Sequence, residues 1–267
     1  MTRIGQCLDK LKVQNRKALV AFITAGDPDI ESTKNIFNVI DDSGADIIEL
    51  GVPFSDPLAD GPVIQASALR ALKSGTTLKK IIALIKTIRK NRNLPIILMT
   101  SFNPVFVYGE NQFIEDVVSA GVDGVIIPDL PPEEAIEFSV KAEKQGLDMI
   151  HLLAPTSTDE RVQMVAKCAR GFIYYISLTG TTGVRAELSA GLLDKVSSIK
   201  QAANIPVLVG FGISTPETAR DAARVSDGVI VGSAIVNLIE KNSDPSQRSK
   251  SLSEFIGSIK QAINEIN

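Results

Sequence analysis

The amino-acid sequence predicts an α/β protein in which eight parallel strands, each followed by a helix, close into a (β/α)8 barrel. Eight short apolar runs recur along the 267 residues, amphipathic stretches separate them, and glycine-rich turns follow the seventh and eighth runs. An open doubly wound sheet has the same periodicity, but the count of eight and the position of the glycines favour closure. The length is normal for one such barrel, so we expect a single domain over residues 1–267.

The predicted strands are rich in valine and isoleucine and show no polar alternation. Runs of this kind are too short for buried helices and are typical of strands that are covered on both faces of a parallel sheet. The eight runs are Ala18–Thr24, Asp46–Glu49, Pro95–Met99, Gly124–Ile127, Asp148–Leu152, Phe172–Ser177, Pro206–Val209 and Gly228–Val231.

Amphipathic stretches between the strands predict the helices. Asp29, Thr158 and Thr215 stand where N-cap residues are expected, and Gly44 and Gly121 stand where a left-handed residue ends a helix. The main predicted helices are Ile30–Ser43, Leu78–Lys90, Glu133–Gln145 and Ala190–Ala202.

Three departures from the simple barrel are expected. Residues 54–93 are too many for one helix and its loops, so we predict additional helices in the loop after strand 2. We expect additional helices after strand 8 as well. An amphipathic turn at Ile4–Leu11 predicts an N-terminal helix that plugs the lower face of the barrel.

Composition and charge limit the classes of partner. With 28 basic and 31 acidic residues the net charge is −3, too mild for a nucleic-acid or anionic-membrane surface, so small substrates are expected. Cys7 and Cys168 are far apart and indicate neither a disulfide framework nor a zinc site. The N-terminal residues lack the apolar stretch of a signal peptide, and no apolar run approaches a membrane span. We therefore expect a cytoplasmic protein.

Acidic residues at the end of the second strand are candidate catalytic groups, because barrels of this kind place their chemistry at the carboxyl ends of the strands. Glu49 is the sole carboxylate at the end of an apolar strand. If its side chain points into the barrel mouth, loss of water contact raises its pKa and makes it a usable acid or base. A surface glutamate at a strand terminus explains the sequence equally well. The loop Val52–Pro62 carries three prolines and two acids and is either an active-site wall or an ordinary connection.

Glycine-rich turns predict a phosphate site. Gly210–Ser214 and Gly232–Val236 follow strands 7 and 8, and backbone amides at such helix starts bind a phosphate monoester without a basic side chain. Thr179–Gly183 follows strand 6 and is interpreted as a lid over the phosphate, the alternative being a surface loop without chemical role. His151, the only histidine, lies inside strand 5 and is expected to be structural, so we predict no metal site or catalytic triad.

The stretch Glu49–Pro62 closely resembles the signature of the tryptophan synthase alpha subunit family. The resemblance covers essentially the whole chain, including Phe22–Pro28, Gly121–Gly124 and Pro128–Pro131. It implies a TIM barrel with an added N-terminal helix. It also implies retro-aldol cleavage of indole-3-glycerol phosphate to indole and glyceraldehyde 3-phosphate, without a cofactor on this chain.

The resemblance implies roles for individual residues. Glu49 would protonate C3 of the indole and help to remove the glycerol hydroxyl proton, while Asp60 would stay ionised and accept the indole N–H. The remaining substrate contacts implied are an apolar slot of Phe22, Met99, Ile126 and Phe211, the tyrosine Tyr174, the lid residues Thr182 and Gly183, and phosphate-binding amides of Gly183, Gly212, Gly232 and Ser233.

A partner follows from the same resemblance. The family pairs its alpha subunit with a pyridoxal-phosphate-dependent beta subunit in an α2β2 assembly, so the pyridoxal phosphate is expected on the partner. The interface residues implied are Pro53, Asp56, Asn103 and Asp129. Two places depart from the family's usual pattern: Ser101 and Phe102 replace a common tyrosine pair, and Leu178 stands at a position that is often basic.

Three other functions are compatible with parts of this pattern. A free-standing indole-3-glycerol phosphate lyase shares the motifs but works without a beta subunit. A subunit that no longer catalyses and acts only as an allosteric partner would not need Glu49 and Asp60. Another phosphate-binding barrel, such as a sugar-phosphate isomerase, would share the glycine turns but not the acidic loop after strand 2.

Overall fold

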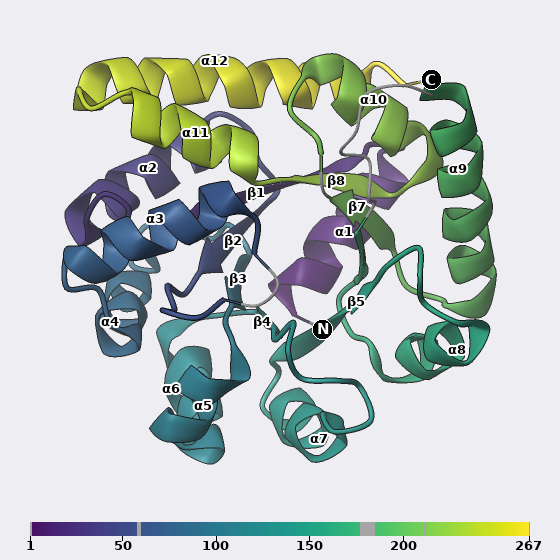
Figure 1. Ribbon diagram of the computed structural model, residues 1–267, viewed down its shortest axis with the longest axis horizontal. Coiled ribbons are helices and arrows are strands. Elements are labelled where there is room, and N and C mark those ends of the chain that lie inside the picture. The colour runs from purple at the N-terminus through teal and green to yellow at the C-terminus, as the bar shows by residue number, and fades with distance from the viewer. Residues whose placement is uncertain (1, 58–59, 177–184, 211, 267) are drawn as a thin grey trace.

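The protein is a closed barrel of eight parallel strands surrounded by helices (Figure 1). The computed structural model describes residues 2–57, 60–176, 185–210 and 212–266, with the backbone alone for 185–191. The strands are β1 (Ala18–Thr24), β2 (Ile47–Gly51), β3 (Ile96–Met99), β4 (Gly124–Ile126), β5 (Asp148–Leu153), β6 (Ile173–Ile176), β7 (Val207–Gly210) and β8 (Gly228–Val231). The predicted barrel is confirmed, and β1 and β8 have the predicted limits.

The helices form an outer layer around the strands, apart from α1 (Figure 1). They are α1 (Arg3–Val13), α2 (Ile30–Asp42), α3 (Pro62–Lys73), α4 (Leu78–Ile88), α5 (Phe102–Tyr108), α6 (Glu110–Ala120), α7 (Ile136–Lys144), α8 (Asp159–Cys168), α9 (Arg185–Ala202), α10 (Pro216–Val225), α11 (Ser233–Lys241) and α12 (Pro245–Asn264). The predicted caps are present: Asp29, Thr158 and Thr215 accept backbone N–H groups of α2, α8 and α10.

Alternation along the strands creates two apolar layers. On β2, Ile47 points into the barrel and packs with Val20, Ile97 and Ile150, whereas Ile48 and Leu50 point outward and pack against the helices. Successive side chains of a strand point to opposite faces. Glu49 therefore points into the barrel like Ile47, two residues nearer to the carboxyl end of the strand.

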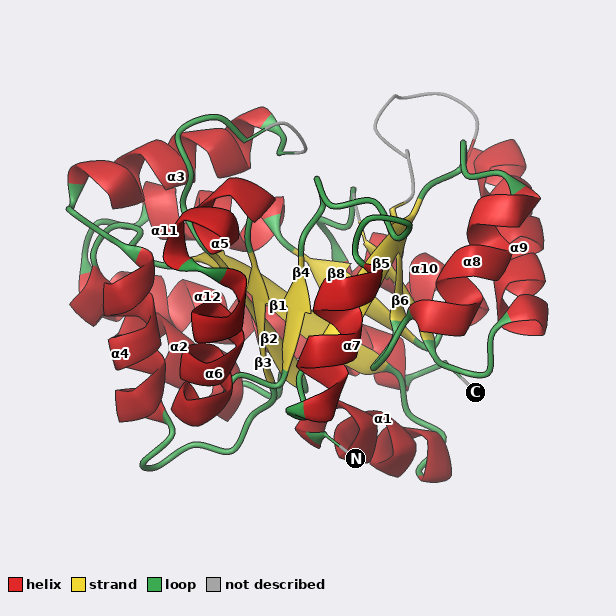
Figure 2. Ribbon diagram, turned by 90° about the horizontal axis from the view of Figure 1, so that it is seen from below, coloured by secondary structure: helices red, strands yellow, loops and turns green. Residues whose placement is uncertain are grey.

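Helix α1 closes the lower end of the barrel, as predicted. Ile4, Leu8 and Leu11 are buried against the inward-facing strand residues. Arg3 anchors the helix through Asp123, whose carboxylate accepts a hydrogen bond from its guanidinium at 2.8 Å. Figure 2 shows α1 at the end of the barrel opposite α3. Helix α1 thus does not cover the upper end of the barrel, where the loops at the carboxyl ends of the strands lie.

Additional helices follow three strands. The predicted additions after β2 (α3 and α4) and after β8 (α11 and α12) are confirmed, and the structure adds the short helix α5 after β3. Helix α5 has no side-chain cap from its own N-cap residue, Ser101. Instead, Asp129 of the loop after β4 accepts the Phe102 N–H at 2.9 Å. This cap comes from a distant part of the chain, so local sequence patterns did not reveal the helix.

Among the described residues, no helix combines the length and the apolar character needed to cross a membrane.

Candidate active site

A cavity of about 410 Å³ opens at the carboxyl ends of the strands, inside the ring of loops. Small-molecule sites commonly occupy this end of such barrels. Its described walls share an apolar character interrupted by two carboxylates and a polar end formed by turns. They are Phe22, Glu49, Asp60, Gly61, Pro62, Val63, Ile64, Met99, Leu152, Tyr174, Ile176, Gly212, Ile213, Ser214, Ile230, Gly232, Ser233, Ala234 and Asn237.

Glu49 lies on the wall of this cavity and is almost completely buried, with 1% of its surface exposed. Its Oε2 atom has no hydrogen-bond partner among the described residues. Burial, reinforced by the negative charge of Asp60, raises the pKa of Glu49 from 4.5 to about 8. The carboxyl group is therefore mostly protonated at neutral pH and is placed to donate a proton to a molecule in the cavity.

Asp60 reaches the same cavity from the loop that precedes α3. Gly61, the next residue, is the N-cap of that helix, and the Gln65 side chain donates a hydrogen bond to the Asp60 carbonyl at 2.8 Å. Burial raises the pKa of the Asp60 carboxyl above its usual value. The structure thus brings together the two carboxylates that the sequence predicted as catalytic, in a cavity that also contains the turns at Gly212 and Gly232.

The aromatic rings of Phe22 and Tyr174 line the cavity, and each occupies space that a glycine on the neighbouring strand leaves open. A Cβ on Gly51 would lie 2.6 Å from the Phe22 ring, and a Cβ on Gly210 would lie 2.6 Å from the Tyr174 hydroxyl. Any larger residue at these strand ends would push the rings away. Burial, together with the charges of Glu49 and Asp60, raises the pKa of Tyr174 well above its usual value, so its hydroxyl stays protonated.

The end of the cavity formed by β7 and β8 carries polar groups without basic side chains. Gly212, Gly232 and Ser233 line it, and α11 begins at Ser233 with no side chain capping its first turn. The free amides of such a turn, together with the helix dipole, favour an anion. No lysine or arginine is found among the described residues of the cavity wall.

Three sequence-predicted contacts, Phe211, Thr182 and Gly183, lie outside the described residues, as does the departure at Leu178. Ile126 is fully buried in the barrel interior and is not among the residues that line the cavity. Phe22, Met99, Tyr174, Gly212, Gly232 and Ser233 all line it.

Sequence reasoning missed several wall residues, chiefly Ile64, Leu152, Ile176, Ile230 and Asn237. Three of them lie on strand stretches that were predicted from the sequence, and the inward alternation of those strands was the signal that would have identified them. Ile64 and Asn237 are on helices, where no comparable signal exists.

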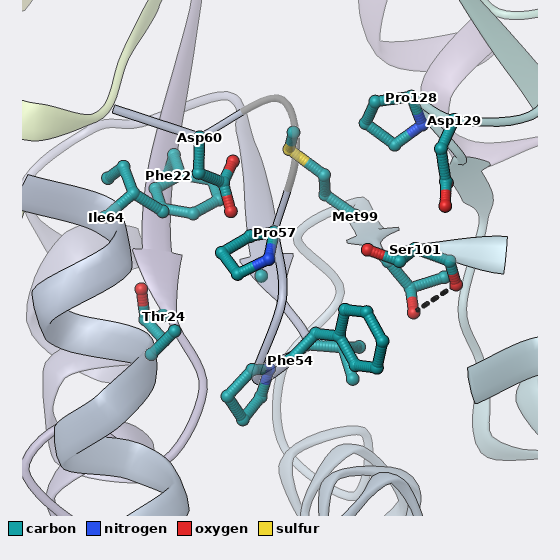
Figure 3. Close-up of a pocket in the computed structure, with 15 residues that line it drawn as sticks. Phe22, Thr24, Phe54, Pro57, Asp60, Ile64, Met99, Ser101, Pro128 and Asp129 are labelled. Atoms are coloured by element: carbon teal, nitrogen blue, oxygen red, sulfur yellow. Dashed lines mark hydrogen bonds between the residues drawn. The ribbon is translucent and has the colours of Figure 1, made fainter. Parts of the chain in front are cut away.

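A second, smaller cavity of about 40 Å³ adjoins the first and shares Phe22, Asp60, Ile64 and Met99 with it. Its other described walls include Pro53 and Asp129, two of the four residues predicted to face a partner. Figure 3 shows Asp60 on one side of this cavity, Asp129 on the other, and Met99 between them. Asp56 and Asn103, the other two, are exposed.

His151 lies away from the substrate cavity. It is 3% exposed, and its neighbours Met149 and Leu153, which share its face of β5, pack outward against the helices. The expected structural role fits this packing, but the Nε2 atom has no hydrogen-bond partner among the described residues. Burial, with a smaller contribution from the Arg161 charge, lowers the pKa of His151 from 6.5 to about 4.

The single histidine makes this shift directly measurable. We expect the imidazole signals in an NMR titration to change with a midpoint near pH 4. The unfolded chain binds this proton near pH 6.5 and the folded chain only near pH 4, so the free energy of unfolding should fall as pH falls through that window. The loss should reach roughly 3 kcal/mol from this residue. A titration midpoint near pH 6.5 would contradict the buried, neutral imidazole.

No group of histidine, cysteine, aspartate and glutamate side chains suited to hold a metal ion is present within the described part of the chain.

Known proteins match this chain over nearly its whole length. Residues 8–264 match the family model described as tryptophan synthase alpha chain. The tryptophan synthase alpha chain of Geotalea uraniireducens is 50% identical over 266 residues, which cover 100% of this chain and 99% of that relative. That of Geobacter sulfurreducens is 49% identical over 263 residues, covering 98% of this chain and 99% of the relative.

Solved structures agree with the sequence relatives. Tryptophan synthase subunit alpha from Legionella pneumophila superposes with a TM-score of 0.91 at 40% identity, with both chains fully covered. A chain of Mycobacterium tuberculosis tryptophan synthase in its aminoacrylate-bound form superposes with a TM-score of 0.88 at 33% identity, covering 98% of this chain and 100% of that one.

Proposed function

The chain belongs to the tryptophan synthase alpha chain family, whose activity is the cleavage of indole-3-glycerol phosphate to indole and glyceraldehyde 3-phosphate, and we propose that Glu49 and Asp60 carry out this reaction. One observation carries the proposal: a buried carboxyl group with a raised pKa shares a cavity with a second carboxylate and with free helix amides. We assign the whole chain, residues 1–267, to one catalytic domain.

The first step is the protonation of the indole C3 carbon, which bears the glycerol phosphate. Glu49 holds a proton at neutral pH because burial raises its pKa to about 8. Transfer of this proton converts C3 to a tetrahedral carbon and leaves a positive charge on the ring nitrogen. Glu49 becomes a carboxylate in the same step.

Asp60 stabilises the cation formed in this step. Its carboxylate accepts the ring N–H, whose positive charge develops only as C3 is protonated, so the interaction strengthens in the transition state. The negative charge of Asp60 adds to the raised pKa of Glu49, which favours the arrangement with the proton on Glu49 and a single negative charge on Asp60.

The second step breaks the carbon–carbon bond. The Glu49 carboxylate removes the proton from the glycerol hydroxyl next to C3, and the electrons of that O–H bond form the aldehyde carbonyl. The electrons of the breaking carbon–carbon bond return to the indolenine ring and neutralise its nitrogen. Indole and glyceraldehyde 3-phosphate result, and Glu49 has recovered its proton.

The apolar wall and the polar end of the cavity orient the substrate for both steps. Phe22, Ile64, Met99 and Tyr174 offer a surface that suits the flat indole ring. The free amides at Gly232 and Ser233 suit the phosphate. Binding energy from this remote phosphate holds the reacting carbon near Glu49.

A beta subunit is the partner that the family implies. We assign the assembly as α2β2, with the pyridoxal phosphate on the beta subunit and Pro53, Asp56, Asn103 and Asp129 at the interface. The small cavity between Asp60 and Asp129 supports this assignment, because it extends the substrate site toward Pro53 and Asp129. Indole is apolar and uncharged, so direct transfer prevents its loss.

An indole-release assay on the purified chain, with and without a beta subunit, tests the paired function. We expect slow release by the chain alone and an increase of about tenfold or more with the partner, a usual size for coupling between subunits. Fast release that the partner leaves unchanged would identify a free-standing lyase. Absence of release in both conditions would overturn the assigned activity.

A further inference from the structure

Asn237 is a residue of the cavity wall that the reaction steps above do not use. It lies on α11, four residues after Ser233, and both residues line the cavity. Residues four apart lie on one face of a helix, and helical side chains lean toward the N-terminus. The Asn237 side chain therefore lies on the same side of α11 as Ser233, near the first turn of the helix, which has no side-chain cap and whose residues Ser233 and Ala234 line the cavity.

The carboxamide is available to a ligand. Its atoms form no hydrogen bond with any residue that the structure describes. Asn242, at the other end of the same helix, shows the contrasting case: its Nδ2 group donates to the Leu238 carbonyl at 2.8 Å. A side-chain amide without an internal partner on a cavity wall is suited to bind a polar group of the substrate.

The charges around the cavity indicate which polar group of the substrate Asn237 binds. Both carboxylates, Glu49 and Asp60, belong to the wall where the indole ring reacts, and the described wall has no basic side chain to offset a phosphate. A phosphate dianion at the α11 turn therefore depends on neutral N–H and O–H donors. Two further donor hydrogens on the Asn237 Nδ2 atom meet this need, since hydrogen bonds to charged groups are the stronger ones.

We propose that Asn237 is a phosphate-binding residue, which donates from Nδ2 to an oxygen of the sugar-phosphate monoester. This inference rests on the proposed function, because it concerns the phosphate of the same substrate. Asn237 thereby adds a side-chain hydrogen bond to those that the backbone amides of one helix turn donate to the phosphate. Unlike the backbone amides, this side chain can be altered by mutation.

Three substitutions at this position separate the roles of hydrogen bonding and charge. Asn237→Leu removes the donor, Asn237→Asp places a negative charge against the phosphate, and Asn237→Lys supplies a positive charge. We expect the KM for indole-3-glycerol phosphate to rise about tenfold in the leucine variant and further in the aspartate variant, and to stay equal or fall in the lysine variant. The inhibition constant of inorganic phosphate should follow the same order.

Two controls accompany these variants: indole as a ligand without a phosphate, and Asn111 as an asparagine outside the cavity. Indole lacks a phosphate, so its dissociation constant should change less than about twofold in all three variants. Asn111 is an exposed asparagine on α6, and Asn111→Asp should leave both ligands unaffected. The inference is overturned if the leucine and aspartate variants bind inorganic phosphate as the parent chain does, or if phosphate and indole affinities fall together.

Binding of inorganic phosphate to the unmodified chain and to the variants can be measured by calorimetry, without any reaction. The test of the Asn237 assignment is therefore separate from the test of the proposed lyase activity. If phosphate binds and weakens in the expected order but no indole is released, the assignment of Asn237 stands and the proposed chemistry fails.

Discussion

Replacing Glu49 with glutamine is expected to lower the rate of indole release by about 10²- to 10⁴-fold, the usual contribution of a general acid–base group. The same substitution is expected to stabilise the folded protein above pH 5. Glutamine keeps the shape of the side chain but neither donates an acidic proton nor accepts one. The loss should appear mainly in kcat, because the cavity that binds the substrate is unchanged.

The gain in stability follows from the raised pKa of Glu49. The carboxyl group ionises near pH 4.5 in the unfolded chain and near pH 8 in the folded one. Between these values the folded state binds more protons, so the free energy of unfolding falls as pH rises. The cost is on the order of 3 kcal/mol at pH 7, and the substitution removes it.

Urea unfolding of the parent chain and the variant at pH 5 and pH 8 measures this difference, which should grow with pH. Glu134→Gln is a matched control, because Glu134 is exposed on the loop before α7 and should change neither activity nor stability. Activity within tenfold of the parent chain would exclude Glu49 as the acid–base group. A stability difference that is constant with pH would exclude the buried, protonated carboxyl.

Replacing Asp60 with asparagine should lower kcat by about 10²- to 10³-fold, which is typical for the loss of one group that stabilises transition-state charge. The asparagine carbonyl still accepts the indole N–H, so the KM should change much less. The negative charge that stabilises the protonated ring is lost. Because the same charge contributes to the raised pKa of Glu49, the apparent pKa of that group in the pH–rate profile should fall.

The pH–rate profile distinguishes this role from a merely structural one. Asp56→Asn alters an exposed aspartate of the same loop and should leave the kcat and pH profile of the isolated chain unchanged. A normal kcat in the Asp60→Asn variant would remove Asp60 from the proposed chemistry. A low kcat with an unshifted profile would show that the two carboxylates do not interact.

Most of the fold was predictable because it depends on local patterns. Strand residues that are covered on both faces are apolar throughout, so β1 and β8 were predicted with their observed limits. The caps at Asp29 and Thr158 were equally local. Helix α5 was missed because its first amide is capped by Asp129, a residue 27 positions away in the chain.

The sequence by itself determined the barrel and the types of residue at the strand ends: the acid on β2, the acid in the following loop and the glycines after β7 and β8. The tertiary structure alone decided between a surface and a buried Glu49, since burial depends on barrel closure around the inward face of β2. It also decided that Asn237 joins the cavity wall and that Ile126 does not. These outcomes depend on which residues distant in sequence meet across the barrel mouth, and no local pattern encodes that packing.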